Sequence, residues 1–112
     1  MSRIVSDETK VAQVQLLCQS TMSSAEAVAA HELDWDMYEH QKERYQRNKL
    51  KALQITNSIV DRSYFEAALH HIIDLCLAAN EVNDAIRIFN TITVDVIRES
   101  ILKAHPNLEQ NA

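Results

Sequence analysis

Apolar residues recur at steps of three and four along most of this chain, which is the spacing of amphipathic helices. The first such stripe predicts a helix over residues 7–30, with Ser6 as its N-cap and acidic residues in its first turn. After a short break at 31–33, Asp34 is the N-cap that we expect for a second helix over 35–57. The apolar members of the first stripe are Val11, Val14, Leu17, Cys18, Met22, Ala25, Val28 and Ala29.

A third apolar stripe keeps helical phase from Phe65 to Ile101 and predicts one long helix over residues 64–103. Ser63 and Glu66 have the Ser-x-x-Glu spacing of a capping box at its start. Because the apolar phase continues to the end of this segment, we predict a single rod as its main form.

Two stretches of this rod have other local preferences. Polar residues at 80–84 leave a hinge between two helices as the alternative. The stretch 91–97 is almost entirely β-branched, but no second such run exists to pair with it, so we expect it to be helical. The predicted fold is all-α, an antiparallel bundle of three long helices in one domain over 7–104, with tails at 1–6 and 105–112.

The composition supports helices joined by short links. The 112 residues include no glycine and a single proline, Pro106. Tight β-hairpins and phosphate-binding loops need residues that adopt positive φ, and glycine is the usual one. The net charge of −5 also argues against nucleic acid, whose phosphates are bound by lysine and arginine.

The chain has the features of a cytoplasmic protein. We expect no secretory signal, because the first residues lack an apolar run followed by small residues. No apolar stretch approaches the roughly 20 residues that span a bilayer, so we expect no membrane insertion. Cys18 and Cys76 lie in apolar helical stripes, which favours buried, reduced thiols.

Candidate catalytic and metal-binding groups are few. Glu66, His70 and Asp74 are spaced by four residues on one helix side, but a metal site needs convergent ligands from elsewhere, so a solvated polar face is the favoured interpretation. Neither Cys18 nor Cys76 has a neighbouring cation that would lower its pKa and make it a nucleophile. We therefore expect a non-enzyme, with no catalytic residues, no metal and no cofactor.

A cationic run lies in the second predicted helix. Residues 42–51 include five lysines and arginines and one acid, Glu43. The run has three interpretations: a solvated helix face, a surface for an acidic protein partner, or a nucleic-acid contact. Of the two partners, the net acidity of the chain favours the protein.

The third predicted helix carries apolar residues nearly all round between residues 65 and 79. It is either the central element of a bundle or a helix with surface to spare for a partner or a second copy of the chain. We favour the partner surface. The expected contact residues are Leu75, Val82, Ile86 and Phe89 of this helix, with Tyr38 and Tyr45 of the second.

Three stretches resemble the FliT family of flagellar export chaperones. They are the segment LLCQS at 16–20, the segment ELDWD at 32–36 after an alanine-rich helix end, and the polar Asn80-Glu81 step in the third helix. The resemblance implies a cytosolic chaperone that binds the C-terminal region of the flagellar cap protein and delivers it to the export apparatus. It implies no catalytic residue.

The function predicted from the sequence is therefore a protein-binding export chaperone that masks an amphipathic segment of its partner. One alternative is a small acidic inhibitor or immunity protein. Another is a regulator that acts through protein or nucleic-acid contacts.

Overall fold

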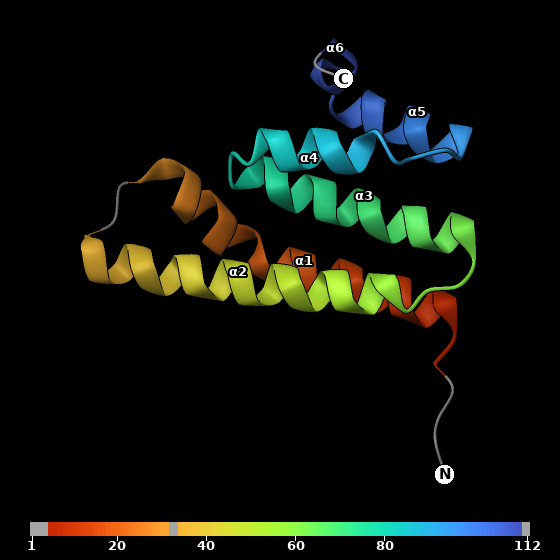
Figure 1. Ribbon diagram of the computed structural model, residues 1–112. Coiled ribbons are helices and arrows are strands. Elements are labelled where there is room, and N and C mark those ends of the chain that lie inside the picture. Colours follow the sequence, from red (N-terminus) through yellow and green to blue (C-terminus); the bar gives the residue numbers. More distant parts are fainter. Residues whose placement is uncertain (1–4, 32–33, 111–112) are drawn as a thin grey trace.

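The computed structural model describes residues 5–31 and 34–110, and in these ranges the regular structure is entirely helical (Figure 1). Residues 1–4, most of the predicted N-terminal tail, and residues 32–33 of the predicted first break lie outside the described part. The helices are α1 (Asp7–Ala30), α2 (Trp35–Asn57), α3 (Arg62–Ala78), α4 (Val82–Phe89), α5 (Asp95–Ala104) and α6 (Asn107–Gln110).

Helices α1 and α2 form an antiparallel hairpin with the predicted bounds (Figure 1). The Ser6 hydroxyl accepts a hydrogen bond from the Thr9 backbone N–H at 3.1 Å, and the Asp34 carboxylate accepts one from the Met37 N–H at 3.0 Å. Each side chain satisfies a backbone donor that has no partner within the helix. Local sequence signals therefore define both helices.

Helix α3 begins earlier than predicted. Its N-cap is Asp61, whose carboxylate accepts from the Tyr64 N–H at 3.1 Å, so the predicted start at Ser63 is wrong. Ser63 lies inside the helix, and Glu66 does not form a capping box with it. The side chain of Glu66 is instead fully buried.

The prediction of one helix over 64–103 is wrong, and its first break falls at the alternative hinge. Asn80 has a φ of 62°, a left-handed conformation that asparagine tolerates better than most residues. The N–H of Glu81 donates to the Cys76 carbonyl at 2.8 Å, and the N–H of Asn80 to the Leu77 carbonyl at 3.0 Å. This pair of bonds is a Schellman motif, which ends α3 and turns the chain into α4.

The second break lies in the β-branched stretch, where residues 91–94 leave the helix instead of continuing it. The buried Glu66 carboxylate accepts hydrogen bonds from the N–H groups of Thr93 and Val94, each at 2.8 Å, and from the Thr93 hydroxyl at 2.8 Å. Arg62 donates to the same carboxylate at 2.6 Å. A contact between α3 and the loop before α5 thus overrides the helical phase.

The expected tail at 105–112 is also corrected, because residues 107–110 form α6. Leu108 on this helix is buried within the core. His105, between α5 and α6, makes a 2.6 Å hydrogen bond to the Asp74 carboxylate of α3. The C-terminal segment therefore packs back on α3.

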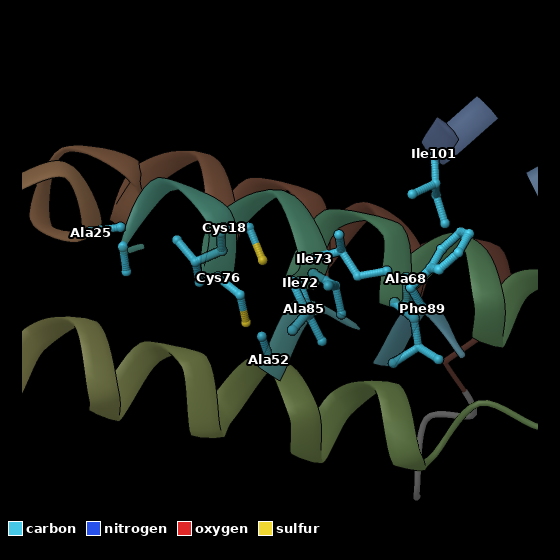
Figure 2. Close-up of a cluster of buried hydrophobic side chains, with 14 of the residues drawn as sticks. Cys18, Ala25, Ala52, Ala68, Ile72, Ile73, Cys76, Ala85, Phe89 and Ile101 are labelled. Carbon is cyan, nitrogen blue, oxygen red and sulfur yellow. The ribbon is translucent and has the colours of Figure 1, made fainter. Parts of the chain in front are cut away.

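Helix α3 is the centre of the fold. It packs against α1, α2, α4 and α5. Figure 2 shows Ile72, Ile73 and Cys76 of α3 among buried side chains from these four helices. The neighbouring residues labelled there are Cys18 and Ala25 of α1, Ala52 of α2, Ala85 and Phe89 of α4, and Ile101 of α5. A large apolar side chain buried in this way contributes about 1.5–3 kcal/mol to folding. None of the helices in the described part of the chain combines the length and hydrophobicity of a membrane span.

Candidate functional site

Three of the predicted partner-contact residues belong to the core. Leu75 and Phe89 have no exposed surface, and Tyr45 is almost completely buried. The prediction that they form a docking surface is therefore wrong for the folded chain. Leu75 is enclosed because α3, on which it lies, packs against α1, α2, α4 and α5, and Phe89 belongs to α4, one of the helices that cover α3.

Tyr45 has a structural role at the junction between α2 and α4. Its hydroxyl donates a hydrogen bond to the Glu81 carboxylate, and Lys49 reaches the same carboxylate at 2.9 Å and that of Asp84 at 3.2 Å. Burial raises the pKa of the Tyr45 hydroxyl well above its usual range, and the hydrogen bond to Glu81 raises it further. Tyr45 thus stays protonated and holds α2 to the Schellman turn.

The other three predicted contact residues are accessible in part, but they lie in two different places. Val82 is 38% exposed and Ile86 is half-buried, both on α4. Tyr38 lies at the tip of the α1–α2 hairpin, where its ring stacks on that of His31 with 4.9 Å between the centroids. The hollow beside Tyr38 is lined by residues of the hairpin alone, so Tyr38 does not complete a groove with the third predicted helix. A hollow of about 250 Å³ does lie between α2 and α4, but none of the predicted contact residues lines it; its lining residues are Lys49, Leu53, Asp84, Arg87 and Ile88.

A different hollow lies between α1 and α2, with a volume of about 660 Å³. No residue of α3 lines it, although α3 packs against both helices, so the hollow lies on the side of the hairpin that α3 leaves open. We call it the hairpin groove. Its lining residues are Gln13, Leu16, Leu17 and Ser20 of α1 and Lys51 and Ile55 of α2.

Helical spacing places these residues on the groove. Val14, Cys18 and Ala25 are the buried residues that α1 directs toward the core. Residues 13, 16, 17 and 20 recur at steps of three and four on the neighbouring side of the same helix. Lys51 and Ile55, four residues apart, are one turn from each other on α2. The groove is therefore built by regular helix geometry and requires no special loop.

The floor of the hairpin groove is apolar. Leu16 is 67% exposed, while Leu17 and Ile55 are half-buried beside it. Sequence reasoning missed Leu16 and Ile55 because it counted only the residues in phase with each core stripe. The signal was present in Leu16, an apolar residue that does not belong to the stripe of Val14, Leu17 and Cys18.

The rim of the hairpin groove is cationic. Arg44, Arg47 and Lys51 follow at steps of three and four on α2, so their side chains share one side of the helix. Arg44 reaches across to α1 and donates to the Ser20 carbonyl at 3.2 Å. At the opposite end, Lys10 donates to the Ser58 carbonyl at 2.9 Å. Neither Arg47 nor Lys51 forms an ion pair with another described residue.

The nucleophile and metal candidates are placed differently. Burial raises the pKa of Cys18 to about 12, and burial also raises the pKa of Cys76, so both thiols stay protonated. Glu66 is fully buried and bound by Arg62 and the loop before α5, whereas His70 and Asp74 are partly exposed. The described residues contain no cluster of three or more side chains fit to bind a metal ion. The hairpin groove is the candidate functional site.

Searches against protein-family models, curated proteins and solved structures gave no match to this chain. Function is therefore inferred from the surface of the molecule itself.

Proposed function

We propose that this protein is a small protein-binding chaperone that masks an amphipathic helix of its partner in the hairpin groove. The observation that carries the proposal is the exposure of Leu16, which is 67% open to solvent above the partly covered Leu17 and Ile55. Large apolar side chains that gather in a hollow with a polar rim are typical of protein-docking sites. The proposed activity is binding alone, without a catalytic step.

The shape of the groove suits a helix. Within this chain, α3 already lies against both α1 and α2, and a partner helix would occupy the equivalent position on their open side. Helices pack by fitting the side chains of one between those of the next, and a groove between two antiparallel helices accepts a third in this way. Burial of the partner's apolar side chains contributes about 25 cal/mol per Å², from which the costs of ordering are subtracted.

The partner implied by the FliT resemblance is the C-terminal region of the flagellar cap protein. In this form of the proposal, the chaperone binds that region in the cytoplasm, keeps it unassembled and delivers it to the export apparatus. The resemblance rests on segments at 16–20 and 32–36, and the first of these includes three lining residues of the groove, Leu16, Leu17 and Ser20.

The proposal is tested with a Leu16→Asp variant. We expect this substitution to remove binding to the C-terminal segment of the cap protein from the same organism, measured by calorimetry, because it places a charge on the apolar floor. The matched control is Val60→Asp, at a residue that is 90% exposed in the loop between α2 and α3. Both variants should keep the helical content of the parent, measured by circular dichroism.

Each result separates one part of the proposal. If the cap segment does not bind the parent protein, the flagellar assignment is wrong. If the segment binds Leu16→Asp as tightly as the parent, the groove is not its docking site.

A further inference from the structure

We infer that the occupant of the hairpin groove is an acidic amphipathic helix, one with glutamate or aspartate beside its apolar stripe. This inference rests on the proposed function and adds the chemistry of the partner to it. Its basis is the difference in charge between the rim of the groove and the rest of the molecule.

The chain as a whole is acidic, with 16 acidic residues against 11 lysines and arginines. The groove departs from this balance, because Lys51 is the one charged residue among its described lining residues, and Arg47 and Arg44 precede it at steps of four and three on the same side of α2. No acidic residue is among the described residues that line the groove. Complementary charge at the edge of an apolar contact favours one partner over others and increases the association rate.

Some cations elsewhere in the described part of the chain have carboxylate partners, whereas Lys42, Arg98 and Lys103 form no ion pair there. Lys49 pairs with Glu81 and Asp84 at 2.9 and 3.2 Å, and Arg62 pairs with Glu66 at 2.6 Å. Lys51, two residues after Lys49, lines the groove without an ion pair among the described residues. A partner with carboxylates beside its apolar stripe would pair with Lys51 at the edge of the groove.

A second copy of this chain fits the groove poorly. In a twofold symmetric dimer the same surface patch of each copy forms the interface. Such a dimer would bring Arg44, Arg47 and Lys51 of both copies into one interface, and no acidic residue is among the described residues that line the groove. Nucleic acid would use the cations but leave Leu16, Leu17 and Ile55 without an apolar partner. An acidic amphipathic helix would place apolar side chains against the floor of the groove and carboxylates beside the cations of its rim.

The spacing of the groove residues matches such a helix. From Arg44 to Ile55 the rise along α2 is about 16 Å, which corresponds to about three turns of a partner helix. Carboxylates at steps of three and four on the partner would follow the same steps of Arg44, Arg47 and Lys51. Its leucines would lie between the two helices, against Leu16 and Ile55.

The test uses a synthetic, helix-stapled peptide of about four turns, with leucines along one face and glutamates beside them. A matched peptide carries glutamine at each glutamate position, and a third carries lysine. We expect the parent protein to bind the glutamate peptide about tenfold more tightly than the glutamine peptide at low salt, and this difference to shrink as salt screens the charges.

Lys51→Glu should weaken binding of the glutamate peptide by about fivefold and improve binding of the lysine peptide. The matched control is Lys103→Glu, which makes the same charge change at an exposed position of α5 and should alter neither affinity. A misfolded variant would bind no peptide well, so tight binding of the lysine peptide by Lys51→Glu would show that the loss of affinity for the glutamate peptide is an effect of charge.

Equal affinity for the glutamate and glutamine peptides would overturn the acidic-helix inference while the groove remained a docking site. Failure of all three peptides to bind would overturn the inference and count against the proposed function as well. The inference would also be wrong if the free protein formed a dimer that Lys51→Glu dissociates, or if a single-stranded oligonucleotide displaced the glutamate peptide at physiological salt.

Discussion

The α1–α2 hairpin and the C-terminal half of the molecule use their apolar residues in opposite ways. Helix α3 has the richest apolar sequence and packs against α1, α2, α4 and α5, so that Leu75 on α3 and Phe89 on α4 have no exposed surface. Helix α2 is much more polar, yet it borders the groove in which Leu16 is open to solvent. An excess of apolar residues thus identifies the centre of this fold, whereas the proposed docking surface is marked by an apolar residue outside the core stripe.

The two halves also differ in the interactions that define the boundaries of their helices. The hairpin helices start at side-chain caps three residues from the N–H groups that they bind. In the C-terminal half, the loop before α5 is held by Glu66, which is 27 residues away from Thr93. Short-range signals define the first half, whereas a long-range contact defines part of the second.

The largest expected effect separates the core from the groove. Phe89→Ala should lower the free energy of unfolding by about 3–5 kcal/mol, because it removes a fully buried ring and leaves a cavity. Leu16→Ala, at an exposed position, should change the free energy of unfolding by no more than about 0.5 kcal/mol. Urea unfolding followed by circular dichroism measures both values. Equal losses would show that Leu16 is part of the core and that the comparison is wrong.

The next effect concerns the buried carboxylate of Glu66. Glu66→Gln should cost about 2–3 kcal/mol, because an amide cannot accept from Arg62, Thr93 and Val94 as a carboxylate does. Glu99→Gln, at an exposed position on α5, is the matched control and should cost little. Thermal or urea unfolding at neutral pH gives the difference, and a loss no larger than that of the control would contradict this role.

The same carboxylate predicts a dependence of stability on pH. Burial alone would raise the pKa of Glu66, but the hydrogen bonds from Val94, Thr93 and Arg62 outweigh it and hold the pKa below its usual value. The contribution is therefore complete above the unfolded pKa of about 4.5 and is lost as the pH falls through the lower, folded pKa. We expect the parent to lose stability more steeply than Glu66→Gln below that pH in urea titrations. Parallel curves would mean that Glu66 does not contribute to the acid sensitivity.

The smallest expected effect concerns the turn at Asn80. Asn80→Val should destabilise the protein by about 1–2 kcal/mol, because a β-branched residue strongly disfavours the positive φ at this position. Asn80→Gly should be neutral or slightly stabilising, since glycine adopts the left-handed conformation without strain. The free energies of unfolding of the two variants check this. A neutral Asn80→Val would indicate that α3 and α4 are joined as one helix.

The differences between the hairpin and the C-terminal half explain which parts of the structure can be predicted from the sequence. The bounds of α1 and α2 are readable from Ser6, Asp34 and the apolar period, and so is the all-α class. The turn at Asn80 also leaves a local signal, because asparagine is a common left-handed residue after a helix. The break at residues 91–94 leaves none, since it depends on a contact with Glu66 that only the folded chain provides.

The candidate site is predicted only in part. For the cationic run at 42–51 the sequence leaves three interpretations open, one of them a surface for an acidic protein partner, and Lys51 of this run lines the groove. The apolar floor was missed, because periodicity shows which residues face one helix neighbour but not which neighbour is absent. Leu75 and Phe89 were assigned to a surface for the same reason, since nothing in their spacing shows that α4 and α5 fold back to cover α3.

Methyl-resolved NMR of the isoleucine, leucine and valine side chains tests the central claim most directly. During titration with the glutamate peptide, we expect the largest chemical-shift changes at Leu16, Leu17 and Ile55, and little change at the enclosed Leu75. Changes centred on Val82 and Ile86 of α4, with the three groove residues unaffected, would place the docking surface elsewhere and contradict the account.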